Sequence, residues 1–173
     1  MQLRADLAAP FLHLACHPWI PRRSRSVKVI LAPVDFSETE ERVVREAAVI
    51  AKQFDAELRL LHVAAPQADF VGCEIGPQPS SDAQPDTLRE EHSALGRWRD
   101  GLIAEGVRCR AFLLAGRAVE LILEQATEHS ADMIVLGSHG RTAMYKTLVG
   151  SVAEAILRDA ACPVLVIPPK LVG

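Results

Sequence analysis

Three glycines and a serine in the stretch VLGSHGRTAMYKTLVGSVAEAIL have the residue types of a phosphate-binding loop. Gly137 and Gly140 follow an apolar run, and glycine lets a backbone approach a ligand closely and adopt positive φ. Gly150 and Ser151 begin a helical pattern, and the N–H groups and dipole at a helix N-terminus favour an anion. The Ser151 hydroxyl can donate to a phosphate oxygen or simply cap the helix. Spacing alone therefore leaves phosphate binding and ordinary turn chemistry equally open.

Two common nucleotide-binding motifs are absent from this stretch. A Walker A loop reads G-x-x-x-x-G-K-[ST], whereas Gly150 is followed directly by Ser151 with no lysine between them. The glycines also lack the G-x-G-x-x-G spacing of a dinucleotide-binding turn. Phosphoryl transfer needs a held metal and a positioned base or water, and neither a base loop nor paired carboxylates accompany the glycines. No Ser-His-Asp or Cys-His set follows from the spacing, so we do not expect a dedicated enzyme.

The bulk composition narrows the class of protein. The chain has 173 residues, of which 49% are hydrophobic, and this suffices for one domain with a substantial core. A net charge of −3 argues against nucleic-acid binding, because nucleic-acid binders usually carry a basic face. No apolar run reaches the roughly 18 residues of a membrane span. The four cysteines form no C-x-x-C pair, which predicts free thiols in a reducing compartment rather than zinc ligands or disulfides.

Residues 1–26 are predicted to be an N-terminal extension, flexible or loosely docked, that precedes one domain at 27–173. The stretch LAAPFLHLA is mildly apolar, but Asp6, Pro10 and His13 interrupt it in a way that signal peptides avoid. A start codon assigned too far upstream is an alternative origin for the extension. We therefore expect the protein to stay in the cytoplasm.

Hydrophobic periodicity predicts five strands that alternate with four helices. The first helix is expected to follow Ser37, which is predicted to cap it with Glu40 as the capping-box partner. Ala64 to Asp86 contains four prolines and two glycines and is predicted to be a long irregular loop. Trp98 is expected in the core rather than as a binding platform. The strands are expected at 27–34, 58–63, 107–114, 133–136 and 162–167, and the later helices at 87–105, 118–129 and 151–159.

This order indicates an α/β fold with a doubly wound, mostly parallel five-stranded sheet that helices cover on both faces. Ligands of such sheets bind beyond the carboxyl ends of the strands, where the strand order reverses. The segment PVDFS after the first strand, the long loop after the second and the glycine loop after the fourth all belong to that edge. The unusual residues of the sequence therefore collect in one place.

The outer strands carry information about partners. The third strand alternates apolar residues with Arg108 and Arg110, which suits a partly solvated edge. The fifth strand, from Cys162 to Ile167, carries no charge, and a free apolar edge is an aggregation hazard. We expect it to pair with the same strand of a second copy in a two-fold dimer. The alternative is that the N-terminal extension covers it.

Several of these segments together resemble the universal stress protein family. The resemblance runs from Val27 to Pro168 and rests on ILAPVDFSE, on LRLLHV and on G-x-x-G-x9-G-S followed by V-A-E and C-P-V-L-V. It implies a flavodoxin-like or Rossmann-like fold with strand order 3-2-1-4-5 and dimerisation through strand five. It also implies binding of ATP or a related adenine nucleotide, because the subgroup with this glycine pattern binds such ligands.

The resemblance also assigns residues to the nucleotide. Asp35 would approach the ribose hydroxyls, Pro33 would line the same wall, and Val63 would hold the adenine. The residues that would wrap the phosphates are Gly137, His139, Gly140, Arg141, Gly150, Ser151 and Val152. The residues themselves leave alternatives open: Asp35 as a helix cap or turn former, Arg141 as a solvated charge, and His139 as a loop histidine rather than a catalyst.

The sequence departs from the family pattern in two places. Ala143 stands where many members have glycine, and Met144 and Tyr145 where they often have smaller or basic residues. The loop between the second and third glycines is therefore expected to sit differently. The long loop after the second strand is a candidate lid over the adenine, with Phe70 as its contact.

We expect an ATP-binding, or AMP- or ADP-binding, stress-response regulator that acts as a cytoplasmic homodimer. Any Mg²⁺ would be held by the phosphates. One alternative is a slow ATPase that hydrolyses the nucleotide inefficiently in the same cradle. The other is a structural dimer module that binds no nucleotide.

Overall fold

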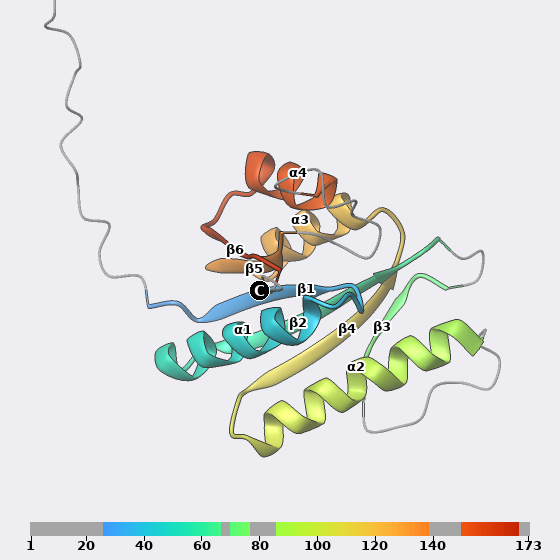
Figure 1. The fold of residues 1–173 in the computed structure, drawn as a ribbon, viewed down its shortest axis with the longest axis horizontal. Coiled ribbons are helices and arrows are strands. Elements are labelled where there is room, and N and C mark those ends of the chain that lie inside the picture. The colour runs from blue at the N-terminus through green and yellow to red at the C-terminus, as the bar shows by residue number, and fades with distance from the viewer. Residues whose placement is uncertain (1–25, 67–69, 77–85, 139–149, 170–173) are drawn as a thin grey trace, which may run out of the picture.

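A six-stranded sheet lies between two pairs of helices in the computed structural model, which describes residues 26–66, 70–76, 86–138 and 150–169. Helices α1 (Glu40–Phe54) and α2 (Asp86–Ala104) cover one face, and α3 (Ala118–Glu128) and α4 (Ser151–Asp159) cover the other (Figure 1). The strands are β1 (Val29–Val34), β2 (Glu57–Ala64), β3 (Gly72–Glu74), β4 (Cys109–Ala115), β5 (Met133–Gly137) and β6 (Val164–Ile167).

The strands follow the order β3-β4-β2-β1-β5-β6 across the sheet. Every neighbouring pair is parallel except β3 with β4, which is antiparallel. The five parallel strands therefore have the order 3-2-1-4-5 among themselves, and the predicted doubly wound α/β fold is confirmed. The sheet is not identical to the prediction, because a sixth strand adds to one side.

That added strand, β3, lies inside the segment predicted to be an irregular loop. It pairs with β4 so that Gly72 stands opposite Leu114. A Cβ atom at Gly72 would lie 2.9 Å from the Leu113 carbonyl oxygen, so this close pairing requires glycine. The sequence predicts the third parallel strand to be a partly solvated edge of the sheet, but it is not the edge, because β3 pairs with its outer side. Arg110 is exposed as expected, and its guanidinium binds the Glu74 carboxylate of β3 at 2.6 Å.

Side chains of the central strands alternate between two cores. In β1, Ile30, Ala32 and Val34 pack with α1 and α2, whereas Leu31 packs with α3 and α4. The same alternation runs through β2, because successive strand residues point to opposite faces. It decides on which face of the sheet each residue near the carboxyl edge places its side chain.

The start of α1 differs from the prediction that Ser37 caps it. The helix begins at Glu40 after the N-cap residue Thr39, and no side-chain cap is formed among the described residues. Ser37 is held in a turn instead, since its N–H donates to Asp35 Oδ1 at 3.2 Å and its carbonyl accepts from the Glu40 N–H at 3.0 Å. The Glu40 carboxylate does reach back over the helix start, but it accepts the N–H of Phe36.

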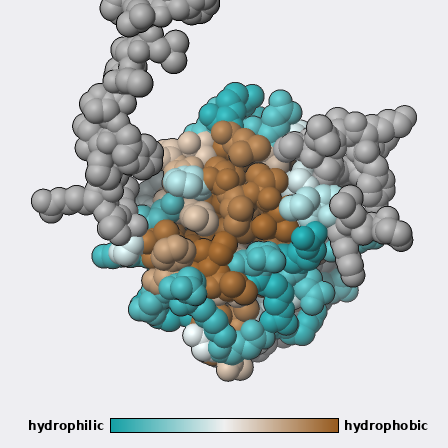
Figure 2. All heavy atoms as spheres, turned by 60° about the vertical axis from the view of Figure 1, so that its left-hand side comes forward, coloured by the Kyte–Doolittle hydropathy of each residue, from teal (hydrophilic) through white to brown (hydrophobic). Residues whose placement is uncertain are grey.

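Strand β6 ends the sheet on the side opposite β3. It begins two residues later than predicted, at Val164, because Pro163 has no N–H to give to a ladder. Leu165 on this strand is 37% exposed. Figure 2 shows apolar side chains gathered over one continuous area of the face that it displays. In the described part of the chain, no helix is both long and apolar enough to cross a membrane.

Candidate functional site

The carboxyl ends of β1, β2 and β5 meet at one edge of the sheet. β1 lies between β2 and β5, and Val34 at its end pairs with His62. Asp35 and Val63 are the next residues along these two strands. Gly137 ends β5 on the other side of β1. The structure therefore brings Asp35, Val63 and Gly137 to the edge where doubly wound sheets bind ligands, as the sequence predicts for that fold.

Pro33 and Val63 are placed toward the same face of the sheet. Pro33 follows the alternation of β1 and shares the face of Leu31, and Val63 packs against the core of α3 and α4. Phe70 instead packs against the core of α1 and α2. The suggested contact between Phe70 and the adenine is therefore not supported by its place in the fold.

The two ends of the glycine loop lie together. The Ser138 N–H donates to the Ile167 carbonyl of β6 at 2.8 Å, and the Gly150 N–H donates to the Ser138 carbonyl at 2.6 Å. These bonds fix the N-terminus of α4 directly against the end of β5. His139, Gly140 and Arg141 lie outside the described residues, as does the rest of 139–149.

The first turn of α4 begins with N–H groups that precede the hydrogen bonds of the helix itself. Gly150 is the N-cap with φ −73° and ψ 158°, and among the described residues no side-chain cap is formed. Ser151 is therefore the first helical residue and does not cap the helix, which removes one of its two predicted roles. The first intrahelical bond from this end runs from the Glu154 N–H to the Gly150 carbonyl at 2.9 Å. The N–H groups of Ser151 and Val152 precede that bond, in the position that binds anions in other helices.

Two expectations about the glycines change. Gly137 is a strand residue paired with Ile167, and among the described glycines only Gly106 and Gly116 have positive φ. Gly137 therefore does not use the positive φ that glycine permits. Gly150 also has a backbone conformation open to other residues, so any need for glycine there comes from space rather than from strain.

Strain appears instead at Phe36, in the turn of residues 35–37 that follows β1. Phe36 has φ 57°, a left-handed conformation that costs an aromatic residue on the order of 1 kcal/mol. Asp35 accepts the Ser37 N–H in the same turn, so its predicted role as a turn former is realised. Residues in such conformations persist only where their surroundings hold them, so the side chains behind this turn must support it.

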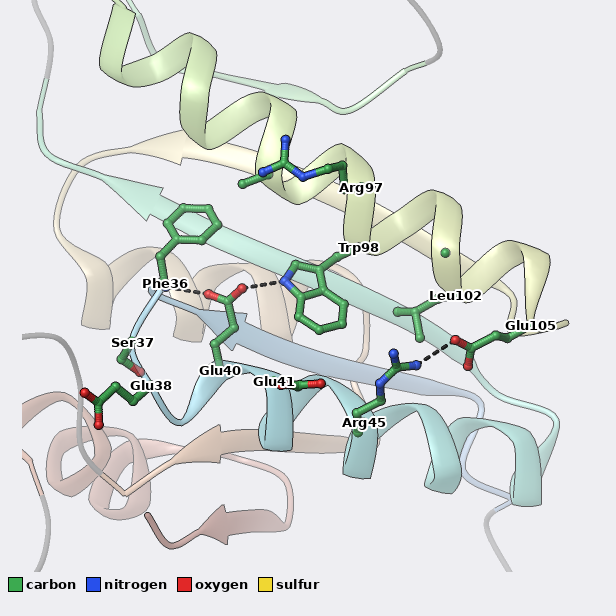
Figure 3. A pocket seen from close by; sticks show the side chains of 12 residues that line it. Phe36, Ser37, Glu38, Glu40, Glu41, Arg45, Arg97, Trp98, Leu102 and Glu105 are labelled. Atoms are coloured by element: carbon green, nitrogen blue, oxygen red, sulfur yellow. Dashed lines mark hydrogen bonds and ion pairs between the residues drawn. The ribbon is translucent and has the colours of Figure 1, made fainter. Parts of the chain in front are cut away.

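Two buried side chains support the 35–37 turn from behind. The His62 ring lies 4.4 Å from the Phe36 ring, centroid to centroid, and its Nδ1 lies 2.8 Å from the Val34 carbonyl oxygen. The Glu40 carboxylate accepts the Phe36 N–H at 2.5 Å and the Trp98 indole N–H at 2.5 Å (Figure 3). Burial raises the pKa of Glu40, and the hydrogen bonds from Trp98 and Phe36 oppose that rise.

A groove of about 690 Å³ lies beside this support, between α1 and α2. Phe36 lines one end and the Arg45–Glu105 ion pair, 2.6 Å long, lines the other (Figure 3). Trp98 packs against the core, as predicted, but also lines this groove and bonds to Glu40. No group of three His, Cys, Asp or Glu side chains that could hold a metal ion occurs in the described ranges.

The sequence pattern does not single out His62, Glu40 or Trp98 as site residues. One signal was available: His62 interrupts a strand whose inward positions are otherwise leucine and alanine, at Leu58, Leu60 and Ala64. A titratable residue at an inward strand position needs a polar partner. The identity of that partner depends on the tertiary fold.

The sequence of this chain is similar to those of known proteins over most of its length. The family model described as the universal stress protein family matches residues 26–168. Universal stress protein MJ0531 of Methanocaldococcus jannaschii is 35% identical over 141 residues, which cover 81% of each chain. The chain belongs to the universal stress protein family. The predicted membership of this family is thereby confirmed.

Solved structures of the universal stress protein family share the fold. A universal stress protein in complex with cAMP has a TM-score of 0.63 and 21% identity, covering 84% of this chain and 99% of the other. One from Archaeoglobus fulgidus in complex with dAMP has a TM-score of 0.57 and 23% identity, covering 82% and 97%. At these identities the likeness establishes the common fold.

Proposed function

We propose that this universal stress protein is a regulatory protein that binds an adenine nucleotide at the carboxyl edge of its sheet. The observation that carries the proposal is the N-terminus of α4, whose first N–H groups precede the hydrogen bonds of the helix and are fixed against the end of β5 by the Gly150–Ser138 bond. Such a terminus binds phosphate through its N–H groups and its dipole. Related structures in complex with cAMP and dAMP support an adenine nucleotide as the ligand class.

The nucleotide would span the edge from β2 to α4. Asp35 would bind the ribose hydroxyls, with Pro33 beside it, and Val63 would contact the adenine. The phosphates would lie at Gly137, Gly150, Ser151 and Val152, together with His139, Gly140 and Arg141. The proposed nucleotide is ATP, and any Mg²⁺ would be held by its phosphates.

The direct experiment is to ask what the purified protein carries. Denaturing it and analysing the released small molecules by ion exchange is expected to yield ATP, ADP or AMP. Calorimetry on nucleotide-free protein with ATP, AMP and cAMP then ranks the ligands. If no nucleotide is released and calorimetry detects no binding, the proposal is refuted and the structural dimer module remains. Steady release of phosphate from ATP would identify the slow ATPase.

We also propose that the protein acts in the cytoplasm as a homodimer through β6. Leu165 is exposed on this edge strand, and Val164 and Val166 beside it are only partly buried. An apolar edge of this kind is normally paired or covered. Light scattering is expected to give twice the mass of the chain, and Leu165→Lys to give one mass because charge on an edge strand opposes pairing. A monomeric wild-type protein would refute the dimer.

A further inference from the structure

His62 is the link between the turn of residues 35–37 and helix α2. Its Nδ1 must donate to the Val34 carbonyl, because a carbonyl oxygen can only accept. Val34 is the residue directly before Asp35. On the other side of the ring, His62 Nε2 lies 3.5 Å from Oε1 of Glu91 on α2. The buried His62 ring thus contacts both the end of β1, next to Asp35, and helix α2.

The second ring nitrogen is placed where it needs a proton. With Nδ1–H committed to Val34, a neutral His62 presents a lone pair from Nε2 toward the Glu91 carboxylate, and two acceptors repel each other. Nε2 is fully buried, and no hydrogen-bond partner for it occurs among the described residues. A proton on Nε2 turns this contact into an attraction between imidazolium and carboxylate. The seating of α2 against His62 therefore depends on that proton.

A second connection runs in parallel to the first. Glu40 holds the Phe36 N–H with one carboxylate oxygen and the Trp98 indole of α2 with the other. Phe36 is in a left-handed conformation, so its geometry depends on these supports. Both buried groups behind the turn thus reach α2, at Glu91 and at Trp98.

We propose that His62 is a positioning residue for the 35–37 turn and that, through Glu91, it couples adenosine affinity to the seating of α2. This inference rests on the proposed function, because it takes Asp35 as the ribose contact. Protonation of His62 closes the contact to Glu91, steadies the turn and strengthens binding. The charged groups known to face this ring are Glu91 from α2 and Glu40 from α1, both carboxylates.

Glu91 offers a clean perturbation. Glu91→Gln keeps the shape of the side chain and replaces the carboxylate by an amide, which can donate to a neutral Nε2 and accept from a protonated one. Glu90→Gln makes the same change at an exposed position of the same helix. His62→Asn keeps an N–H donor near Nδ1 and removes Nε2. Adenosine is the suitable probe because it lacks the phosphates, whose own titration would add to the pH dependence of binding.

Calorimetry with adenosine at pH 6 and pH 8 tests the coupling. Wild type and Glu90→Gln are expected to bind about fivefold or more tightly at the lower pH. Glu91→Gln and His62→Asn are expected to lose most of that difference, and the double variant to lose no more than either single one. Glu40 remains in every variant, so any pH dependence that it contributes stays constant across the set.

Amide exchange gives a readout without ligand. In the nucleotide-free protein at pH 6, the N–H groups of Phe36 and Ser37 are expected to exchange about fivefold faster in Glu91→Gln than in Glu90→Gln. Equal behaviour of these two variants in both measurements overturns the coupling. A wild-type protein that binds neither adenosine nor nucleotide overturns the proposed function, and amide exchange then still decides whether His62 and Glu91 position the turn.

Discussion

Replacing Trp98 by phenylalanine isolates the hydrogen bond that its indole makes to Glu40. Glu40 is only 7% exposed, and its carboxylate accepts two hydrogen bonds, from Phe36 and from Trp98. Phenylalanine keeps an aromatic ring in place but removes the N–H donor. A hydrogen bond to a charged group contributes about 1.5–3 kcal/mol, so we expect the free energy of unfolding to fall by about 2–3 kcal/mol at pH 8.

The pH dependence of this loss has a definite sign. Burial raises the pKa of Glu40 in the folded state, so its contribution to stability is fully present below the unfolded pKa and is lost as pH rises through the folded pKa. The bond from Trp98 opposes that rise, and removing it raises the folded pKa further. The deficit of Trp98→Phe is therefore expected to be larger at pH 8 than at pH 5.

Urea denaturation followed by circular dichroism at the two pH values measures this deficit. In a thermal unfolding experiment at pH 8, the melting temperature of Trp98→Phe is expected to be roughly 5–10 °C lower than that of the wild type, for a chain of this size. In a Glu40→Leu background, which has no carboxylate to leave unpaired, the same change of Trp98 is expected to cost much less. A deficit under about 0.5 kcal/mol at both pH values, or an equal one in the Glu40→Leu background, would refute the reasoning.

Two further predictions concern parts of the molecule away from the site. Asp132→Ala removes the carboxylate oxygen that accepts the N–H groups of Lys28 and Val29 at 2.8 and 3.2 Å, so the free energy of unfolding is expected to fall by about 1–3 kcal/mol. An unchanged urea midpoint would show that these two hydrogen bonds at the start of β1 do not stabilise the fold. Burial raises the pKa of the Cys109 thiol to about 12, so at pH 8 iodoacetamide is expected to label Cys109 only after unfolding. Labelling of native protein at Cys109, detected by peptide mapping, would contradict the burial described for β4.

The parts of the fold that the sequence predicts correctly are those with local signals. Strands β1, β2 and β5 are short apolar runs bounded by turns, and α4 runs from Ser151 to Asp159 as its pattern predicts. The strand order follows once the family resemblance is recognised. Each of these elements contains its own pattern, so no knowledge of distant contacts is needed.

The missed features depend on contacts between residues distant in the sequence. Strand β3 has three residues in a Pro- and Gly-rich segment and is a strand only because β4 offers it a partner. The Ser37 cap fails because Asp35 folds the backbone into a turn before the helix begins. His62 and Glu91 lie 29 positions apart along the chain, and no periodicity links them. The sequence therefore predicts the edge of the sheet that forms the candidate site, but not the residues behind it, such as His62 and Glu91.

The proposed function requires the N-terminus of α4 to bind the phosphates of an adenine nucleotide. Gly150→Val tests this, because the φ of −73° and ψ of 158° at Gly150 suit valine without strain while the substitution adds bulk directly before the N–H groups of Ser151 and Val152. Calorimetry with ATP and with adenosine is the measurement, and Gly101→Ala, where an added Cβ meets no atom within 4 Å, is the control. We expect Gly150→Val to weaken ATP binding by about 100-fold or more and Gly101→Ala to retain it, with little change of adenosine affinity in either. Equal ATP affinity in wild type and Gly150→Val would contradict it.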